Sequence, residues 1–123
     1  QVAVLGSQIL GKPGNHANAV AQLRRLSGRS AQFLTGLCVH DTRSGRTLTR
    51  LVPFEVRFRP LDEGMIERYL QREQPYDCAA SAKAEALGIA LIAAMNGEDP
   101  NALIGLPLIA LIDLLAEHGL AVL

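Results

Sequence analysis

The residues best suited to chemistry in this sequence are a lysine on a glycine-rich turn and three charged residues in a later loop. Lys12 stands in Gly11-Lys12-Pro13-Gly14, where two glycines and a proline fix the backbone around one charge. An ammonium group on a tight turn can meet a phosphate as a point charge, or it can be an ordinary solvated lysine. Asp77, Lys83 and Glu85 lie in a stretch of small and polar residues without a strong period. Binding residues are often found on such loops.

No motif of the common catalytic classes accompanies these residues. His16, His40 and His118 fall in separate segments, without the spacing of metal ligands. A G-x-S-x-G nucleophile motif, a P-loop and a G-x-G-x-x-G motif are all absent. Taken alone, the residues therefore support an α/β domain with a candidate phosphate site and nothing more specific.

The bulk composition narrows the class of partner. Lys plus Arg and Asp plus Glu both number 12, so the formal net charge of the 123 residues is zero. This balance argues against binding to a nucleic acid polymer, which needs an excess of cations, but it allows a small phosphorylated ligand. The apolar stretch 102–116 is too short and interrupted to span a membrane. Cys38 and Cys78 are predicted to be buried free thiols, and with no secretory signal we expect a cytoplasmic protein.

Hydrophobic periodicity predicts one domain that mixes strands and helices. An apolar hairpin turns at Gly6-Ser7, and the alternation of the strand over 46–59 is the clearest in the chain, with Pro53 marking a bulge, a bend or an edge position. The helix over 106–118 is apolar on nearly every side, which predicts a central position. The expected elements are strands at 2–5 and 9–10, a helix at 15–26, strands at 30–40 and 46–59, a helix at 62–74, a strand at 87–93 and a helix at 106–118.

Longer segments of the sequence resemble one known family. The segments are QV followed by GKPG, the helix end LSG, the block VRFRPLDEGMIERYL, the segment CAASAKAEALGI and the closing GEDPNALIGLPL, and they run through nearly the whole chain in order. They resemble the Maf family of nucleoside triphosphate pyrophosphatases, in its YceF-like branch. The resemblance implies a Maf/ITPase-like α/β fold, with an elongated mixed β-sheet flanked by helices. It also implies cleavage between the α- and β-phosphates of a nucleoside triphosphate, assisted by Mg or Mn.

The resemblance also assigns roles to individual residues. Lys12 matches the family lysine that contacts the phosphates, while Gln1 and Glu85 match two positions that select the substrate. Gln and Glu at these positions resemble the branch that prefers 7-methyl-GTP. A carboxylate suits that base, because it accepts hydrogen bonds from guanine and attracts the positive charge of the methylated ring. Asp77 is expected at the lip of the site or on plain surface, and no residue of the chain is expected to bind the metal.

The resemblance places the catalytic aspartate immediately before Gln1. We therefore expect residues 1–123 to be a single Maf-like domain without the family's N-terminal segment, the C-terminal part of a longer enzyme, inactive alone and without a catalytic residue of its own. Two alternatives stay open: a pyrophosphatase of the dTTP/UTP type, and a non-catalytic nucleotide-binding regulator of cell division. The expected partner is the nucleoside triphosphate, with a homodimer as a further possibility.

Overall fold

A sheet of alternating apolar residues forms the centre of the molecule, and the computed structural model describes all of residues 1–123. The 5-stranded sheet has the order β2-β1-β3-β4-β5, and every neighbouring pair of strands is antiparallel. The α/β class is confirmed, but the sheet within this chain is antiparallel throughout and not mixed. The elements are β1 (Val2–Leu5), β2 (Gln8–Leu10), α1 (His16–Leu26), β3 (Ser30–His40), β4 (Thr47–Phe58), α2 (Glu63–Glu73), the 3₁₀ turns η1 (Ala79–Ser81) and η2 (Leu87–Leu91), β5 (Ile92–Asn96), α3 (Asn101–Ile104) and α4 (Leu108–Glu117).

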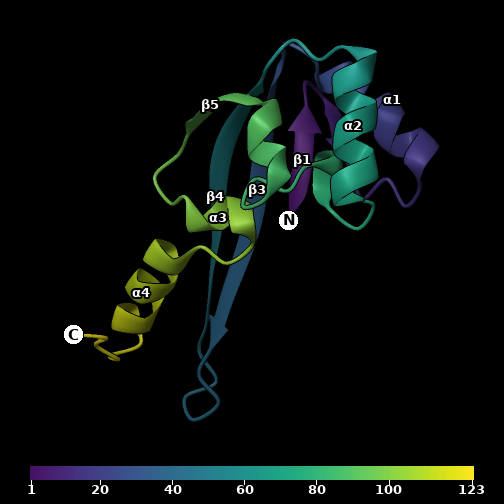
Figure 1. The fold of residues 1–123 in the computed structure, drawn as a ribbon. Coiled ribbons are helices and arrows are strands. Elements are labelled where there is room, and N and C mark those ends of the chain that lie inside the picture. The colour runs from purple at the N-terminus through teal and green to yellow at the C-terminus, as the bar shows by residue number, and fades with distance from the viewer.

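The predicted hairpins are both present. β1 and β2 pair on either side of Gly6-Ser7, where Gly6 adopts a φ of 62° that glycine tolerates without strain. β3 and β4 form a long ribbon that extends well beyond the rest of the sheet (Figure 1). Of the alternatives predicted for Pro53, the edge position is the one observed, and the irregularity of β4 lies at Arg57/Phe58. Pro53 pairs with Leu34 but lies beyond the end of β5, so it occupies a local edge, where its missing N–H costs nothing.

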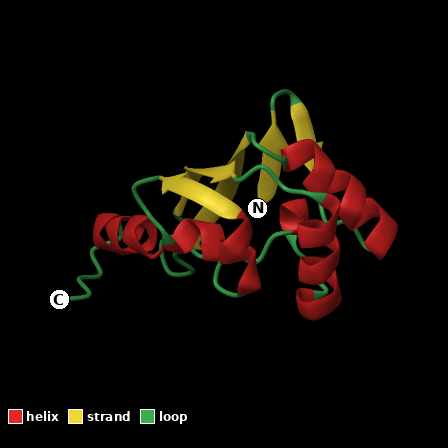
Figure 2. Cartoon of the chain, turned by 45° about the horizontal axis from the view of Figure 1, so that its top comes forward, coloured by secondary structure: helices red, strands yellow, loops and turns green.

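The helices gather on one side of the sheet (Figure 2). The inward face of β3 and β4 presents Phe33, Phe54 and Val56, which belong to the same core cluster as Leu23 of α1 and Leu70 of α2. Burial of these side chains supplies the main stabilisation of this half of the molecule. No helix of the structure combines the length and the apolar character that crossing a membrane requires.

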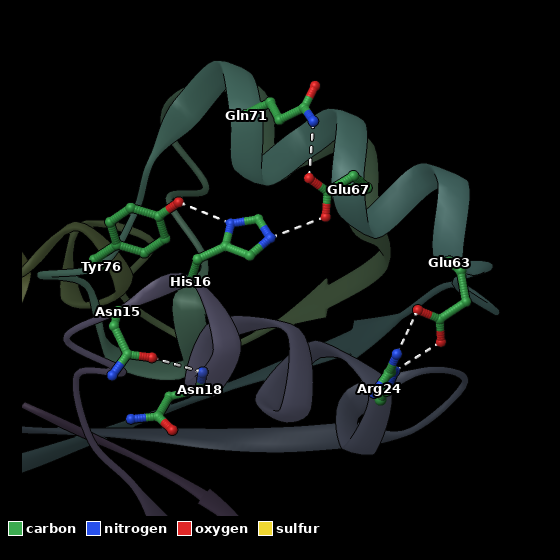
Figure 3. A network of polar contacts seen from close by, with 8 residues as sticks. All are labelled: Asn15, His16, Asn18, Arg24, Glu63, Glu67, Gln71 and Tyr76. Carbon is green, nitrogen blue, oxygen red and sulfur yellow. Dashed lines mark hydrogen bonds and ion pairs between the residues drawn. The ribbon is translucent and has the colours of Figure 1, made fainter.

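Polar contacts fix α1 against α2 and against the turn that follows α2 (Figure 3). The ring of His16 lies 3.0 Å from the Tyr76 hydroxyl through Nδ1 and 2.9 Å from Glu67 through Nε2. At the other end of α1, Arg24 donates two hydrogen bonds to Glu63, at 2.7 and 2.8 Å. These contacts hold the turn at Tyr76 in place, and this turn leads directly into the loop that carries Asp77 and Glu85.

Three sequence-based predictions are wrong. The strand predicted over 87–93 is mostly the 3₁₀ turn η2, and β5 begins only at Ile92. The helix over 106–118 is not central, because α4 packs along the outer part of the β3–β4 ribbon and leaves Ile109 and Ile112 about half exposed. Nor are the two cysteines buried, since Cys38 is exposed and Cys78 is half-buried. Apolar composition alone did not show which of these segments the sheet would cover.

Candidate functional site

A cavity of about 390 Å³ opens where the start of β1 meets the turn after β2, the loop after α2 and the end of α3. Its walls combine apolar residues of the sheet and α3 with a few polar and charged side chains, a composition typical of small-molecule sites. The lining residues are Gln1, Lys12, Phe33, Val56, Asp77, Cys78, Ala79, Ala82, Lys83, Ala84, Glu85, Ile92, Leu103, Ile104 and Gly105. All three residues predicted from the family resemblance, Gln1, Lys12 and Glu85, therefore lie at one cavity. Asp77 lines it as well.

Lys12 reaches this cavity on a turn whose backbone is held from both sides. The carbonyl oxygen of Gly11 accepts hydrogen bonds from the N–H of Ala80, at 3.3 Å, and from Nε2 of Gln22, at 3.0 Å. On the far side, the N–H of Gly14 donates to the carbonyl of Tyr76, at 2.9 Å. None of the five ion pairs in the structure involves Lys12. Its ammonium group is therefore free to meet an anion in the cavity.

The backbone opposite Lys12 is strained and buried. Ala80 and Ser81 both have positive φ, 57° and 54°, and neither side chain is exposed to solvent. A left-handed conformation costs a residue other than glycine about 1–2 kcal/mol. The hydroxyl of Ser81 donates to Oε1 of Gln22, at 2.7 Å, so the same glutamine holds both this turn and Gly11. Strain of this kind is typical of functional sites.

Glu85 is carried by a short loop that is fixed at both ends. The N–H of Lys83 donates to the Tyr69 hydroxyl at 3.2 Å, and the N–H of Leu87 donates to Glu73 at 3.1 Å. The N–H of Gly88 closes the loop on the carbonyl of Lys83, at 3.0 Å. Burial raises the pKa of Tyr69, so its hydroxyl keeps its proton at neutral pH. Glu85 itself is exposed and free of hydrogen bonds to the protein, so both its oxygens can accept from a ligand.

Gln1 is held through its side-chain nitrogen. Nε2 donates to the hydroxyl of Thr35, at 2.8 Å, and to the carbonyl of Ala102, at 2.6 Å. The carbonyl of Leu103 lies 3.3 Å from the same nitrogen. Periodicity offered one hint of this arrangement: Thr35 shares the inward face of β3 with Ala31 and Phe33, where a hydroxyl needs a partner. The carbonyls of α3 could not have been found from sequence, because nothing local marks which backbone groups will approach Gln1.

The remaining polar groups of the cavity add little nucleophilic chemistry. Burial, with a hydrogen bond from Cys78 to Asp77, raises the pKa of the Cys78 thiol. The thiol is therefore protonated at neutral pH and a poor nucleophile. Lys83 lies 3.9 Å from Glu73 and is a second cation at the cavity wall. No group of three His, Cys, Asp or Glu side chains in the structure could hold a metal ion, so these residues do not form a ready-made metal site.

Comparison with known proteins places the chain in a family. Residues 1–118 match the family model described as Maf-like protein. Proteins named 7-methyl-GTP pyrophosphatase are 57% identical to the chain in Nitrosococcus oceani, over 100% of this chain and 62% of the relative, and in Methylobacillus flagellatus, over 99% and 64%. The relative of that name in Pseudoalteromonas translucida is also 57% identical, over 100% and 61%. The chain thus spans about three fifths of the length of these curated relatives, and it belongs to the Maf family.

Proposed function

We propose that the protein is a nucleoside triphosphate pyrophosphatase that cleaves 7-methyl-GTP between its α- and β-phosphates, giving the monophosphate and pyrophosphate. The observation that carries this proposal is that Gln1, Lys12 and Glu85 line one cavity although they are far apart in the sequence. The names of relatives that are 57% identical over the whole chain support the same substrate.

Each of the three residues has a distinct part in the proposal. The ammonium group of Lys12 meets the phosphate oxygens and stabilises the negative charge that water must approach. The carboxylate of Glu85 accepts hydrogen bonds from N1–H and the amino group of guanine, and it favours the positive charge of the methylated ring. Gln1 contacts the same base, while the apolar wall that includes Phe33 and Ile92 excludes water from its faces.

The general base and the metal are proposed from the family resemblance and not from residues of this cavity. The family resemblance puts an aspartate directly before Gln1 as the base that activates water, and no residue of 1–123 is proposed for that step. Mg or Mn assistance is proposed through the family alone, and Mg usually binds through substrate phosphates with one or two carboxylates.

We also propose that residues 1–123 form one Maf-like domain and that the protein is cytoplasmic, in keeping with its two free thiols. A homodimer is proposed as well, and sedimentation would test it.

The decisive experiment measures pyrophosphate release by the protein at its natural full length, with Mg or Mn, across 7-methyl-GTP, GTP, UTP and dTTP. The proposal predicts the highest kcat/KM for 7-methyl-GTP and a shift toward UTP and dTTP when Glu85→Gln is introduced. Preference of the unaltered protein for UTP or dTTP would favour the other pyrophosphatase type. Nucleotide binding without any turnover would favour a non-catalytic regulator and overturn the proposal.

A further inference from the structure

The Gln1 side chain is bound in a way that distinguishes its two terminal atoms. Its nitrogen Nε2 lies within 3.3 Å of three oxygens, those of the Thr35 hydroxyl and of the Ala102 and Leu103 carbonyls. Carbonyl oxygens only accept hydrogen bonds. If the amide were turned by half a rotation, Oε1 would face the Ala102 carbonyl at the 2.6 Å that Nε2 now occupies. That arrangement is repulsive, so the hydrogen-bond partners themselves assign the amide orientation.

The hydroxyl of Thr35 also determines which terminal atom of Gln1 it can bind. Thr35 is 2% exposed, and the only proton of its hydroxyl is donated to the Ala102 carbonyl at 3.0 Å. Toward Gln1 the hydroxyl therefore has only lone pairs to offer, and it must accept from Nε2. Thr35 thus ties β3, α3 and Gln1 together and excludes a hydrogen bond to Oε1. The oxygen Oε1 is left as the only terminal atom of Gln1 that is free for a ligand.

We propose that Thr35 is a positioning residue that orients the Gln1 amide so that Oε1 is offered to the nucleobase in the cavity. The inference rests on the proposed function and extends it. Together with the carboxylate of Glu85, it makes the base-reading groups all hydrogen-bond acceptors. Guanine matches them with two neighbouring donors, N1–H and the amino group. Hypoxanthine lacks the amino group, and uracil has a single N–H between two carbonyls, so both leave an acceptor without a partner, which costs binding.

The test compares Thr35→Val, which removes the hydroxyl at similar volume, with Thr35→Ser, which keeps it. In the full-length protein, Thr35→Val should lower the ratio of kcat/KM for GTP to that for ITP three- to tenfold, and Thr35→Ser should retain it within twofold. A merely structural defect would lower both rates together. The control is Val39→Ala, because Val39 lies four residues further along β3, on the same face as Thr35. This control should reduce stability and leave the ratio unchanged.

A second measurement, the exchange of the Gln1 side-chain amide protons, uses the unaltered protein and needs neither turnover nor a folded variant. In the unaltered protein, both side-chain amide protons of Gln1 should exchange slowly with solvent by NMR, because both are hydrogen-bonded. Fast exchange of either proton, or an unchanged GTP-to-ITP ratio in a folded Thr35→Val protein, would overturn the role of Thr35. An absence of guanine preference in the unaltered protein would instead overturn the proposed function, and the amide exchange would still decide whether the Gln1 amide is held through its nitrogen.

Discussion

Replacing Gly88 by alanine should displace the loop that carries Glu85. A Cβ at this position would lie 2.4 Å from the carbonyl oxygen of Lys83 and 2.7 Å from both its carbonyl carbon and its nitrogen. These are backbone atoms, so no side-chain rotation can relieve the contact. Ordinary contacts begin near 3.4 Å, so the loop must move by roughly 1 Å, a displacement that can cost 10²-fold in rate when it affects positioned groups.

The contacts around the loop determine where this displacement goes. Tyr69 and Glu73 hold its two ends through the N–H groups of Lys83 and Leu87, so the strain falls on the segment between them, which carries Glu85. Overpacking of this kind typically costs about 1–3 kcal/mol of stability. We therefore expect Gly88→Ala to lower the urea midpoint and to reduce the kcat/KM ratio of 7-methyl-GTP to UTP at least tenfold.

The control for this change is Gly64→Ala in α2. Its Cβ would meet the end of the flexible Arg68 side chain at 2.9 Å and Oδ1 of Asp62 at 3.3 Å, both side-chain atoms that can shift, and alanine is favoured over glycine in a helix interior by about 1 kcal/mol. Gly64→Ala should therefore keep both stability and selectivity. If Gly88→Ala keeps the stability and the selectivity of the unaltered protein, the loop does not position Glu85 and this reasoning is refuted.

Three further predictions concern single charged or reactive groups. Lys12→Ala should lower kcat/KM at least tenfold, or about 1.4 kcal/mol, without lowering the thermal midpoint, and an unchanged rate would remove Lys12 from the phosphate site. In a Cys38→Ser background, the rate of Cys78 alkylation should rise only at a pH above the ordinary thiol range, because burial raises the pKa of the Cys78 thiol. Bound nucleotide should slow this alkylation, because Cys78 lines the cavity. An alkylation rate that does not change with nucleotide would contradict binding in this cavity. The hydrogen bonds from Arg24 lower the pKa of Glu63, so its contribution to stability is present above the unfolded pKa of about 4.3 and is lost as pH falls through the lower folded value. Glu63→Gln should flatten the acid side of the curve of unfolding free energy against pH, by a small amount because the pair is exposed.

The sequence predicted elements well where local pattern and tertiary context agree. The helix α1 begins after Asn15, which caps it by accepting from the N–H of Asn18, and α2 begins after Asp62, which accepts from Met65. Both helices bury an apolar stripe at helical spacing, formed by Ala19, Leu23 and Leu26 in α1 and by Ile66, Tyr69 and Leu70 in α2. Prediction failed at 87–93, where Gly88 packs against the backbone of Lys83 and the chain turns before it can pair. Such a contact between segments leaves no local pattern in the sequence.

Only part of the candidate site could be predicted from the sequence. Local chemistry singled out Lys12 and the loop that carries Glu85, whereas Gln1 was chosen through family resemblance alone, and all three lie at the same cavity. The groups that hold these side chains in place were not found, because Thr35 and Tyr69 act through hydrogen bonds to distant parts of the chain. Residues that contact a ligand have types that suggest chemistry, but residues that orient them are recognised only once their partners are known.

The architecture explains why residues from such distant segments converge. Val2 pairs with Leu34, so the start of β1 brings Gln1 beside Thr35. On the other side, Gln22 connects the Lys12 turn to the strained backbone at Ser81 through hydrogen bonds to Gly11 and Ser81. The Lys12 turn and the loop leading to Glu85 are therefore fixed to the same helix, while the amide of Gln1 is fixed to the sheet. If the proposed function holds, the packing of α1 on the sheet therefore sets the distance between the groups that meet the base and the lysine that meets the phosphates, and this packing contributes to substrate selection as well as to stability.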